Sequence, residues 1–296
     1  MARSGDRYGP NRRLTAYLRN PGAPATVIFG ALAAYIGWSL LRQAFIFALP
    51  PETGWGETRI GFLLNAGFFA ILISFTALTA QRLHGIEPSR FLGDRRVLWS
   101  DMKAVAKWIG GFYLALFAVY ALVFDSFAAA EMRSLPAWLA FLPFACGAIA
   151  VQTLAEEFFY RGYLHHFASR FFRSPWAWLL VPSVAFGVAH VFNDTTSFGT
   201  IFTYIAYVTC FGVAAADLTA RTGSLGAAWG LHFANNVFVI CVSAEEGGFM
   251  SGAALYVFQP LLQDYVPDGG ALAMSLTYNL MFLLVMWLLA RNALRL

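Results

Sequence analysis

The chain has 296 residues, of which 59% are hydrophobic, 17% aromatic and only 12% charged, with a formal net charge of +4. A soluble domain usually carries about 25% charged residues, so this chain has too few charges to cover a surface that faces water. The three cysteines, Cys146, Cys210 and Cys241, lack the spacing of a disulfide framework or a metal site. The composition therefore excludes a soluble globular protein and predicts a membrane protein.

Eight apolar stretches are long enough to cross a bilayer as helices, which takes roughly 20 residues each. The predicted spans are 27–49, 60–81, 104–124, 136–159, 176–192, 198–216, 225–243 and 271–290, and we expect the fourth to continue to Phe172. Residues 1–25 form a basic tail, which we expect to be mobile or to lie on anionic lipid. The sequence thus predicts an all-α membrane helix bundle with one transmembrane domain over residues 26–296.

The distribution of basic residues predicts the orientation of this bundle. With eight spans, both termini share one side of the membrane, and that side holds fifteen lysines and arginines. The opposite side holds only Arg59 and Arg133. Because cytoplasmic loops carry an excess of Lys and Arg, we expect both termini to be cytoplasmic.

Polar and charged residues inside the predicted spans are costly, so they indicate either function or specific pairing. They fall into three clusters, on the fourth, fifth and seventh spans: Glu156, Glu157 and Arg161; His190; and His232, Asn235 and Asn236. At a rise of 1.5 Å per residue, all three clusters reach overlapping depths, about 14–24 Å from the cytoplasmic ends of their helices. The sequence therefore predicts that three helices bring these groups together in one pocket.

Helical spacing assigns a direction to each side chain. Residues four apart share a helix face, so we expect Glu157 and Arg161 to form a structural ion pair. Glu156 is rotated by about 100° from Glu157 and is expected to face the pocket, with Tyr160 on the same face. His232 and Asn236 are also four apart, and the neighbouring Asn235 could take the place of Asn236.

These residue types indicate hydrolysis, by one of two mechanisms. In the first, Glu156 is the general base that deprotonates a water, His190 positions that water, and His232 and Asn236 stabilise the oxyanion. In the second, Glu156, His190 and His232 bind a metal ion, since this ligand set suits zinc. A structural alternative is a buried polar network that only holds the helices together.

The three clusters also resemble the signature of the CPBP family of intramembrane proteases, which includes CAAX proteases and bacteriocin-processing proteins and is related to the Ras-converting-enzyme type of CAAX prenyl endopeptidases. The resemblance covers about residues 136–243. The pattern Glu-Glu-x-x-x-Arg, Phe-x-x-x-His, His-x-x-x-Asn is met here by Glu156, Glu157 and Arg161, by Phe186 and His190, and by His232 and Asn236. The resemblance implies an endopeptidase of eight helices that opens toward the cytoplasm, with Glu156, His190, His232 and Asn236 carrying the chemistry.

We therefore expect an integral protein of the bacterial cytoplasmic membrane that cleaves a membrane-embedded or lipidated polypeptide, with a divalent metal such as zinc as a possible cofactor. No feature indicates a nucleic-acid partner. Two other functions stay open: a membrane module that binds a peptide or confers bacteriocin immunity without cleavage, and a proton-coupled transporter, because buried Glu and His also serve proton relays. His165 and His166, near the end of the fourth span, are expected to be interfacial.

Overall fold

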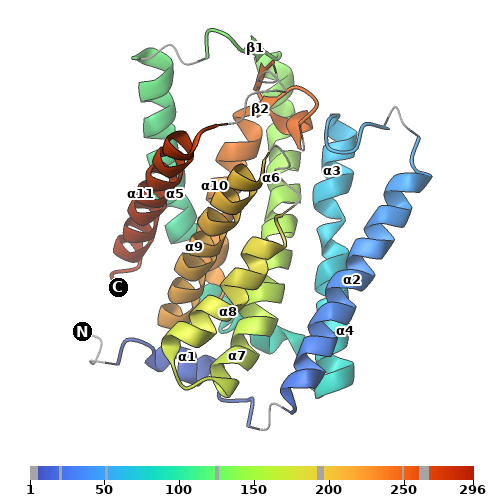
Figure 1. The fold of residues 1–296 in the computed structure, drawn as a ribbon, viewed down its shortest axis with the longest axis vertical. Helices are drawn as coiled ribbons and strands as arrows, with labels where there is room; N and C mark the ends of the chain where they lie inside the picture. The colour runs from blue at the N-terminus through green and yellow to red at the C-terminus, as the bar shows by residue number, and fades with distance from the viewer. Residues whose placement is uncertain are drawn as a thin grey trace.

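The computed structural model describes residues 6–19, 22–50, 53–123, 127–191, 197–248, 250–259 and 267–296. Long helices lie side by side along one axis and form a bundle, with short strands only at one end (Figure 1). The predicted all-α membrane bundle is confirmed. The last residues of two predicted spans, 124 and 192, lie outside the described residues.

Every predicted span contains a helix. The helices are α2 (Pro24–Ala48), α3 (Arg59–Gly67), α4 (Phe69–His84), α5 (Arg95–Leu122), α6 (Leu135–Glu157), α7 (His165–Phe171), α8 (Pro175–Val188), α9 (Phe198–Thr222), α10 (Gly226–Cys241) and α11 (Gly269–Ala293). In the described part of the chain, six helical stretches are long and apolar enough to cross a membrane, with α3 and α4 counted as one. Helices α8 and α10, with 14 and 16 residues, fall short of that length. The structure thus supports a multi-pass membrane protein and does not confirm the count of eight.

The fourth span is the long helix that the sequence predicts, and it runs from residue 135 to 171. Its middle section is a π-helix, η3 (Phe158–Leu164), which begins directly after Glu157 and links α6 to α7. A π-helical turn widens the backbone locally and is frequent at functional sites. It turns the side chains after Glu157 away from the regular α-helical positions.

A small cap closes the end of the bundle drawn at the top of Figure 1. Strands β1 (Glu131–Met132), β3 (Tyr256–Phe258) and β2 (Ser243–Glu245) form one sheet in that order, with β1 antiparallel and β2 parallel to β3. The short helix η4 (Ser251–Ala253) lies beside them, and the indole of Trp138 on α6 donates to the carbonyls of Cys241 and Ala253. This cap fixes the end of α10, the helix that carries His232, to the start of α6.

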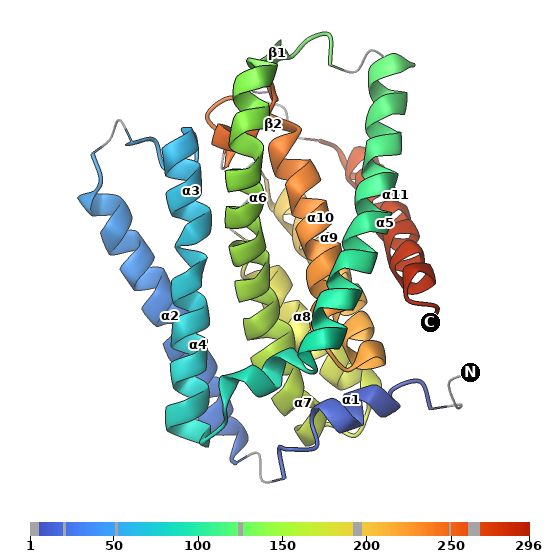
Figure 2. The same ribbon diagram turned by 180° about the vertical axis from the view of Figure 1, so that it is seen from behind.

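The N-terminal segment packs beneath the opposite end of the bundle. Helix α1 (Gly9–Leu14) lies across that end beside α7 and contacts α9 (Figure 2). The Asn11 amide oxygen is 3.1 Å from Nε2 of His165, and the Tyr17 hydroxyl is 2.9 Å from Nδ1 of His166. Both histidines are fully buried, so the prediction that they are interfacial is wrong, because the N-terminal segment covers them.

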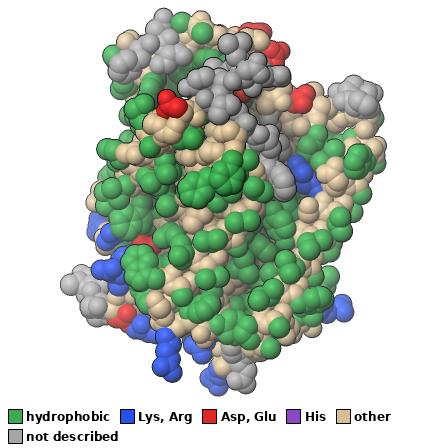
Figure 3. Space-filling view, viewed as in Figure 1, with side chains coloured by type: hydrophobic (Ala, Val, Ile, Leu, Met, Phe, Trp, Pro, Cys, Tyr) green, Lys and Arg blue, Asp and Glu red, His purple; other side chains and the backbone are tan. Residues whose placement is uncertain are grey.

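Charged side chains separate along the bundle axis. In the space-filling view, Lys and Arg gather at the lower end, where α1 lies, and acidic side chains lie mainly at the upper end beside the strands (Figure 3). The sides of the bundle between these ends expose large apolar side chains, such as Phe29, Leu114 and Met274. This arrangement is typical of a bundle whose flanks face lipid.

Candidate active site

The two adjacent glutamates lie in the last turn of α6, deep within the bundle. Glu156 is 7% exposed and Glu157 is fully buried. Oε1 of Glu157 lies 3.1 Å from Nη1 of Arg161, and this buried pair is the one that the four-residue spacing predicts. The Arg161 guanidinium also stacks on the ring of Phe186, at 4.5 Å. Two contacts, with Glu157 and with Phe186, therefore hold the Arg161 guanidinium in place.

His232 on α10 joins the two carboxylates. Its Nδ1 is 2.8 Å from Oε1 of Glu157, and its Nε2 is 3.4 Å from Oε2 of Glu156. A carboxylate can only accept, so Nδ1 carries the proton of the first contact and the ring turns Nε2 toward Glu156. Glu157, expected to act only as a structural partner of Arg161, thus also orients His232.

A chain of hydrogen bonds reaches Glu156 from the other side of the site. The Tyr113 hydroxyl on α5 donates to Oδ1 of Asn235 at 2.6 Å, and the Asn235 amide donates to Oδ1 of Asn236 at 3.0 Å. The Asn236 amide then donates to Oε1 of Gln152 at 3.1 Å, and Nε2 of Gln152 donates to Oε2 of Glu156 at 2.8 Å. All four donors point the same way, so the chain ends on the carboxylate and fixes one of its oxygens.

The sequence motifs do not include Gln152 or Tyr113. Gln152 had a detectable signal, because it lies four residues before Glu156 and therefore on the same helix face. It is uncharged, so the cost of burying a charge in a membrane span does not distinguish it from its neighbours. Tyr113 had no such signal, since nothing in the third span indicates that α5 packs against the helix of Asn235. That contact depends on Gly226 and Gly230, where an added Cβ would clash with the backbone of α5.

His190 lies just beyond the end of α8 and is half-buried. Its Nδ1 is 2.7 Å from the carbonyl oxygen of Phe186, which fixes that nitrogen as the donor and leaves Nε2 unprotonated in the neutral ring. Its ring packs on Phe186 at 4.6 Å, and the same phenyl ring contacts His232 at 5.8 Å and Tyr160 at 5.0 Å. Phe186 is thus the common neighbour of the three clusters, whereas Glu156 and His232 meet directly.

The predicted metal set does not form in this arrangement. Among the described residues, no group of three or more His, Cys, Asp or Glu side chains is placed to hold a metal ion. Glu156 and His232 are close enough to share a ligand, but His190 contacts His232 only through Phe186. The side chains as placed do not fit a bound zinc ion, and metal dependence stays a prediction from the sequence.

The comparisons with known proteins concern the central segment that carries this site. Residues 134–238 match the family described as type II CAAX prenyl endopeptidase Rce1-like. The uncharacterized protein YyaK of Bacillus subtilis (strain 168) is 34% identical over 104 residues, which cover 35% of this chain and 34% of that protein. The chain therefore aligns with about a third of the length of this curated relative, and no solved structure matches. The segment from α6 to α10, with all three motifs, matches the Rce1-like family of type II CAAX prenyl endopeptidases, which confirms the resemblance predicted from those motifs.

Proposed function

We propose that the protein is an intramembrane endopeptidase in which Glu156 activates the attacking water. The observation that carries this proposal is the arrangement of two buried carboxylates around one imidazole, with Glu157 orienting His232 and Glu156 3.4 Å from its free nitrogen. Glu157 is thus neutralised by Arg161, while the polar contacts of Glu156 within the described residues are the Gln152 amide and the His232 imidazole, with no arginine or lysine among them. A carboxylate that acts as a general base must be held in place and must not be neutralised by an ion pair.

The proposed reaction follows from these contacts. Gln152 donates to Oε2 of Glu156, and within the described residues no hydrogen bond engages Oε1, which is the oxygen available to a water. Glu156 takes a proton from the water while the water oxygen forms a bond to the carbonyl carbon of the peptide. The C–N bond then breaks, and the proton passes from Glu156 to the leaving nitrogen.

Two donors are available for the negative oxygen that forms during this attack. Asn236 uses one of its two amide hydrogens on Gln152, which leaves the second free for the substrate. Nε2 of His232 can donate whenever it carries a proton, and Glu157 fixes the direction in which it points. Donors held in place before the reaction lower the barrier because they do not have to reorganise as charge develops.

The proposed substrate is a membrane-embedded or lipidated polypeptide, because the site lies between helices with lipid-facing flanks. The proposed location is the cytoplasmic membrane of a bacterium, with the basic end of the bundle inside. The family description and the Bacillus relative support both proposals.

The test is quantitative peptidomics of membranes from cells that express the native protein, Glu156→Gln or Asp217→Asn. Asp217 is the matched control, because it is a buried carboxylate on α9 that bonds Arg221 and lies in a different cluster. We expect Glu156→Gln to lose every peptide that depends on the protein and Asp217→Asn to keep them. A Glu156→Gln profile identical to that of the native protein would remove the basis for a peptidase.

A further inference from the structure

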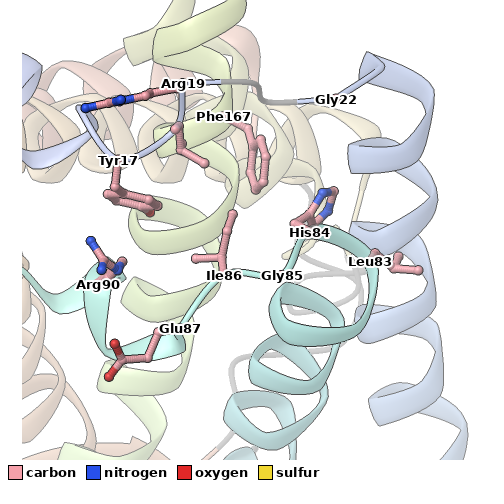
Figure 4. Close-up of a pocket in the computed structure, with 11 residues that line it drawn as sticks. Tyr17, Arg19, Gly22, Leu83, His84, Gly85, Ile86, Glu87, Arg90 and Phe167 are labelled. Carbon is pink, nitrogen blue, oxygen red and sulfur yellow. The ribbon is translucent and has the colours of Figure 1, made fainter.

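Two cavities adjoin at the basic end of the bundle, away from the motif residues. Their volumes are about 540 and 630 Å³, and they share Tyr17, Arg19 and Arg90. Figure 4 shows the smaller one, with Arg19 and Arg90 on either side of the Tyr17 ring. Arg90 belongs to η2 (Pro88–Leu92), the short helix between α4 and α5, so the cavities lie between this helix and the N-terminal segment.

The larger cavity has an excess of positive charge. Arg13 joins Arg19 and Arg90 in its lining, where Asp94 is the one acid, so three positive charges face one negative charge. Asp94 caps α5 by accepting from the backbone N–H groups of Val97 and Arg96, and these bonds lower its pKa. Within the described ranges, none of the three arginines forms an ion pair with a carboxylate.

The smaller cavity adds an apolar wall to these charges. Leu18, Leu83, Ile86 and Phe167 contribute to its lining. His84 and Glu87 also line it, and the Glu87 carboxylate accepts from the Ser89 hydroxyl at 2.6 Å, so the two cavities together hold three arginines and two acids. Leu83 is 41% exposed near the end of α4, so the wall continues onto a flank of the bundle that faces lipid. A ligand that fills both cavities would therefore have an anionic head and an apolar body, and it would lie at the boundary between the bilayer and the cytoplasm.

We propose that these two cavities bind the headgroup phosphate of an anionic phospholipid from the cytoplasmic leaflet. The guanidinium group presents a planar set of donors that matches phosphate oxygens, and basic pockets on the cytoplasmic side are suited to anionic headgroups. The acyl chains would follow Leu83 along α4 into the bilayer. Because Arg13 and Arg19 come from the N-terminal segment and Arg90 from η2, one bound lipid would tie the two together.

The test uses the full chain, purified in detergent and measured by native mass spectrometry with phosphatidylglycerol or with phosphatidylcholine of the same acyl chains. We expect the native protein to retain phosphatidylglycerol preferentially. The triple variant R13Q/R19Q/R90Q should bind it at least about tenfold more weakly. The control R82Q/R95Q/R96Q removes the same charge from three exposed arginines that line neither cavity, and it should bind as the native protein does.

Three results would overturn this proposal. Equal losses of phosphatidylglycerol binding in the two triple variants would indicate a diffuse surface potential. Equal retention of phosphatidylcholine and phosphatidylglycerol by the native protein would show that the headgroup is not recognised. Inorganic phosphate that raises the unfolding temperature as much as phosphatidylglycerol does would indicate a site for a free anion. If the triple variant does not fold, the single variant R13Q replaces it in the test, because the Arg13 side chain makes no hydrogen bond within the described residues. We expect R13Q to bind phosphatidylglycerol more weakly than the native protein, with a smaller loss than is expected for the triple variant. These measurements record binding and do not depend on peptidase activity.

Discussion

Two carboxylate–arginine pairs of identical spacing lie inside this bundle, one on the fourth predicted span and one on α9. Glu157 and Arg161 are 3.1 Å apart at their nearest atoms, and Asp217 and Arg221 are 2.7 Å apart, each pair four residues apart in the chain and largely buried. Their surroundings differ. Glu157 bonds the imidazole of His232, whereas Asp217 accepts from the Tyr8 hydroxyl at 2.8 Å and from the Trp287 indole at 3.0 Å.

This difference separates a candidate catalytic cluster from a structural one. Asp217 connects α9 to the N-terminal segment through the Tyr8 hydroxyl and to α11 through the Trp287 indole, so its bonds fasten elements together. The residue before Glu157 is a second acid, whereas the residue before Asp217 is Ala216. A buried ion pair alone is therefore weak evidence for catalysis. A second acid beside it is stronger evidence when it shares an imidazole with the pair and, within the described residues, has no arginine partner of its own.

After the loss of the proposed base itself, the largest expected effect concerns the imidazole. We expect His232→Phe to slow peptide release by about 10²–10³-fold, because the substitution keeps an aromatic ring and removes the donor and acceptor at Glu156 and Glu157. Trp287→Phe removes a donor from Asp217 in the other cluster and should leave the rate unchanged. The measurement is the rate of release of a peptide whose formation in membranes requires the protein. Equal effects of both substitutions would show that the two clusters do not differ in function.

The arginines should differ in their contribution to stability. Arg161→Met leaves Glu157 buried without its counter-charge, and we expect a loss of about 3–5 kcal/mol in the free energy of unfolding. Arg221→Met should cost less, about 1–3 kcal/mol, because Asp217 keeps the bonds from Tyr8 and Trp287. Thermal and denaturant unfolding of both variants in the same detergent measures the difference. A larger loss for Arg221→Met would reverse this order.

Gln152 tests the chain of hydrogen bonds that ends on Glu156. Gln152→Leu preserves most of the volume and removes the bonds to Glu156 and Asn236, so we expect about a tenfold fall in kcat with little change in KM. Thr153→Val is the control, because the Thr153 hydroxyl is buried and, among the described residues, bonds only to the backbone of its own helix. If both variants lose activity equally, the effect comes from packing in α6 and not from the position of the carboxylate.

The smallest effect is expected at the N-terminal segment. Tyr8→Phe removes the bond to Asp217 and should cost about 1 kcal/mol, with peptidase activity retained. Limited proteolysis of the first 20 residues measures how firmly the segment is attached. Faster cleavage with unchanged peptide release is the expected result. Loss of peptide release in this variant would mean that the segment contributes to the reaction.

The sequence predicts contacts within the candidate site where the residues are charged and lie on one helix. The spacing of Glu157 and Arg161 correctly predicts their ion pair, and the cost of charge in a bilayer identifies Glu156 and His232, which the structure brings together. Each of the eight apolar stretches contains a helix. The count of eight spans is not confirmed, because α8 and α10 are shorter than a spanning helix although the apolar sequence continues beyond their ends.

The remaining features depend on contacts between helices, which one sequence does not encode in a readable pattern. The contact between His232 and Glu157 requires the depth and rotation of α10 relative to α6. The burial of His165 and His166 depends on the fold of a segment about 150 residues earlier in the chain. Helix periodicity describes one helix at a time, so it gives the face of each side chain but not its partner.

The central claim is that Glu156 is the base and that Glu157 orients His232, and a direct comparison of rates tests it. Glu156→Gln removes the proposed base, while Glu157→Gln combined with Arg161→Met removes the neighbouring pair without leaving an unpaired charge. The measured quantity is the rate of release of the peptide identified in membranes, per mole of folded protein. We expect this rate to fall at least about 10³-fold in the first variant and about 10–100-fold in the second. A Glu156→Gln protein that retains more activity than the paired variant would contradict the assignment of Glu156 as the base.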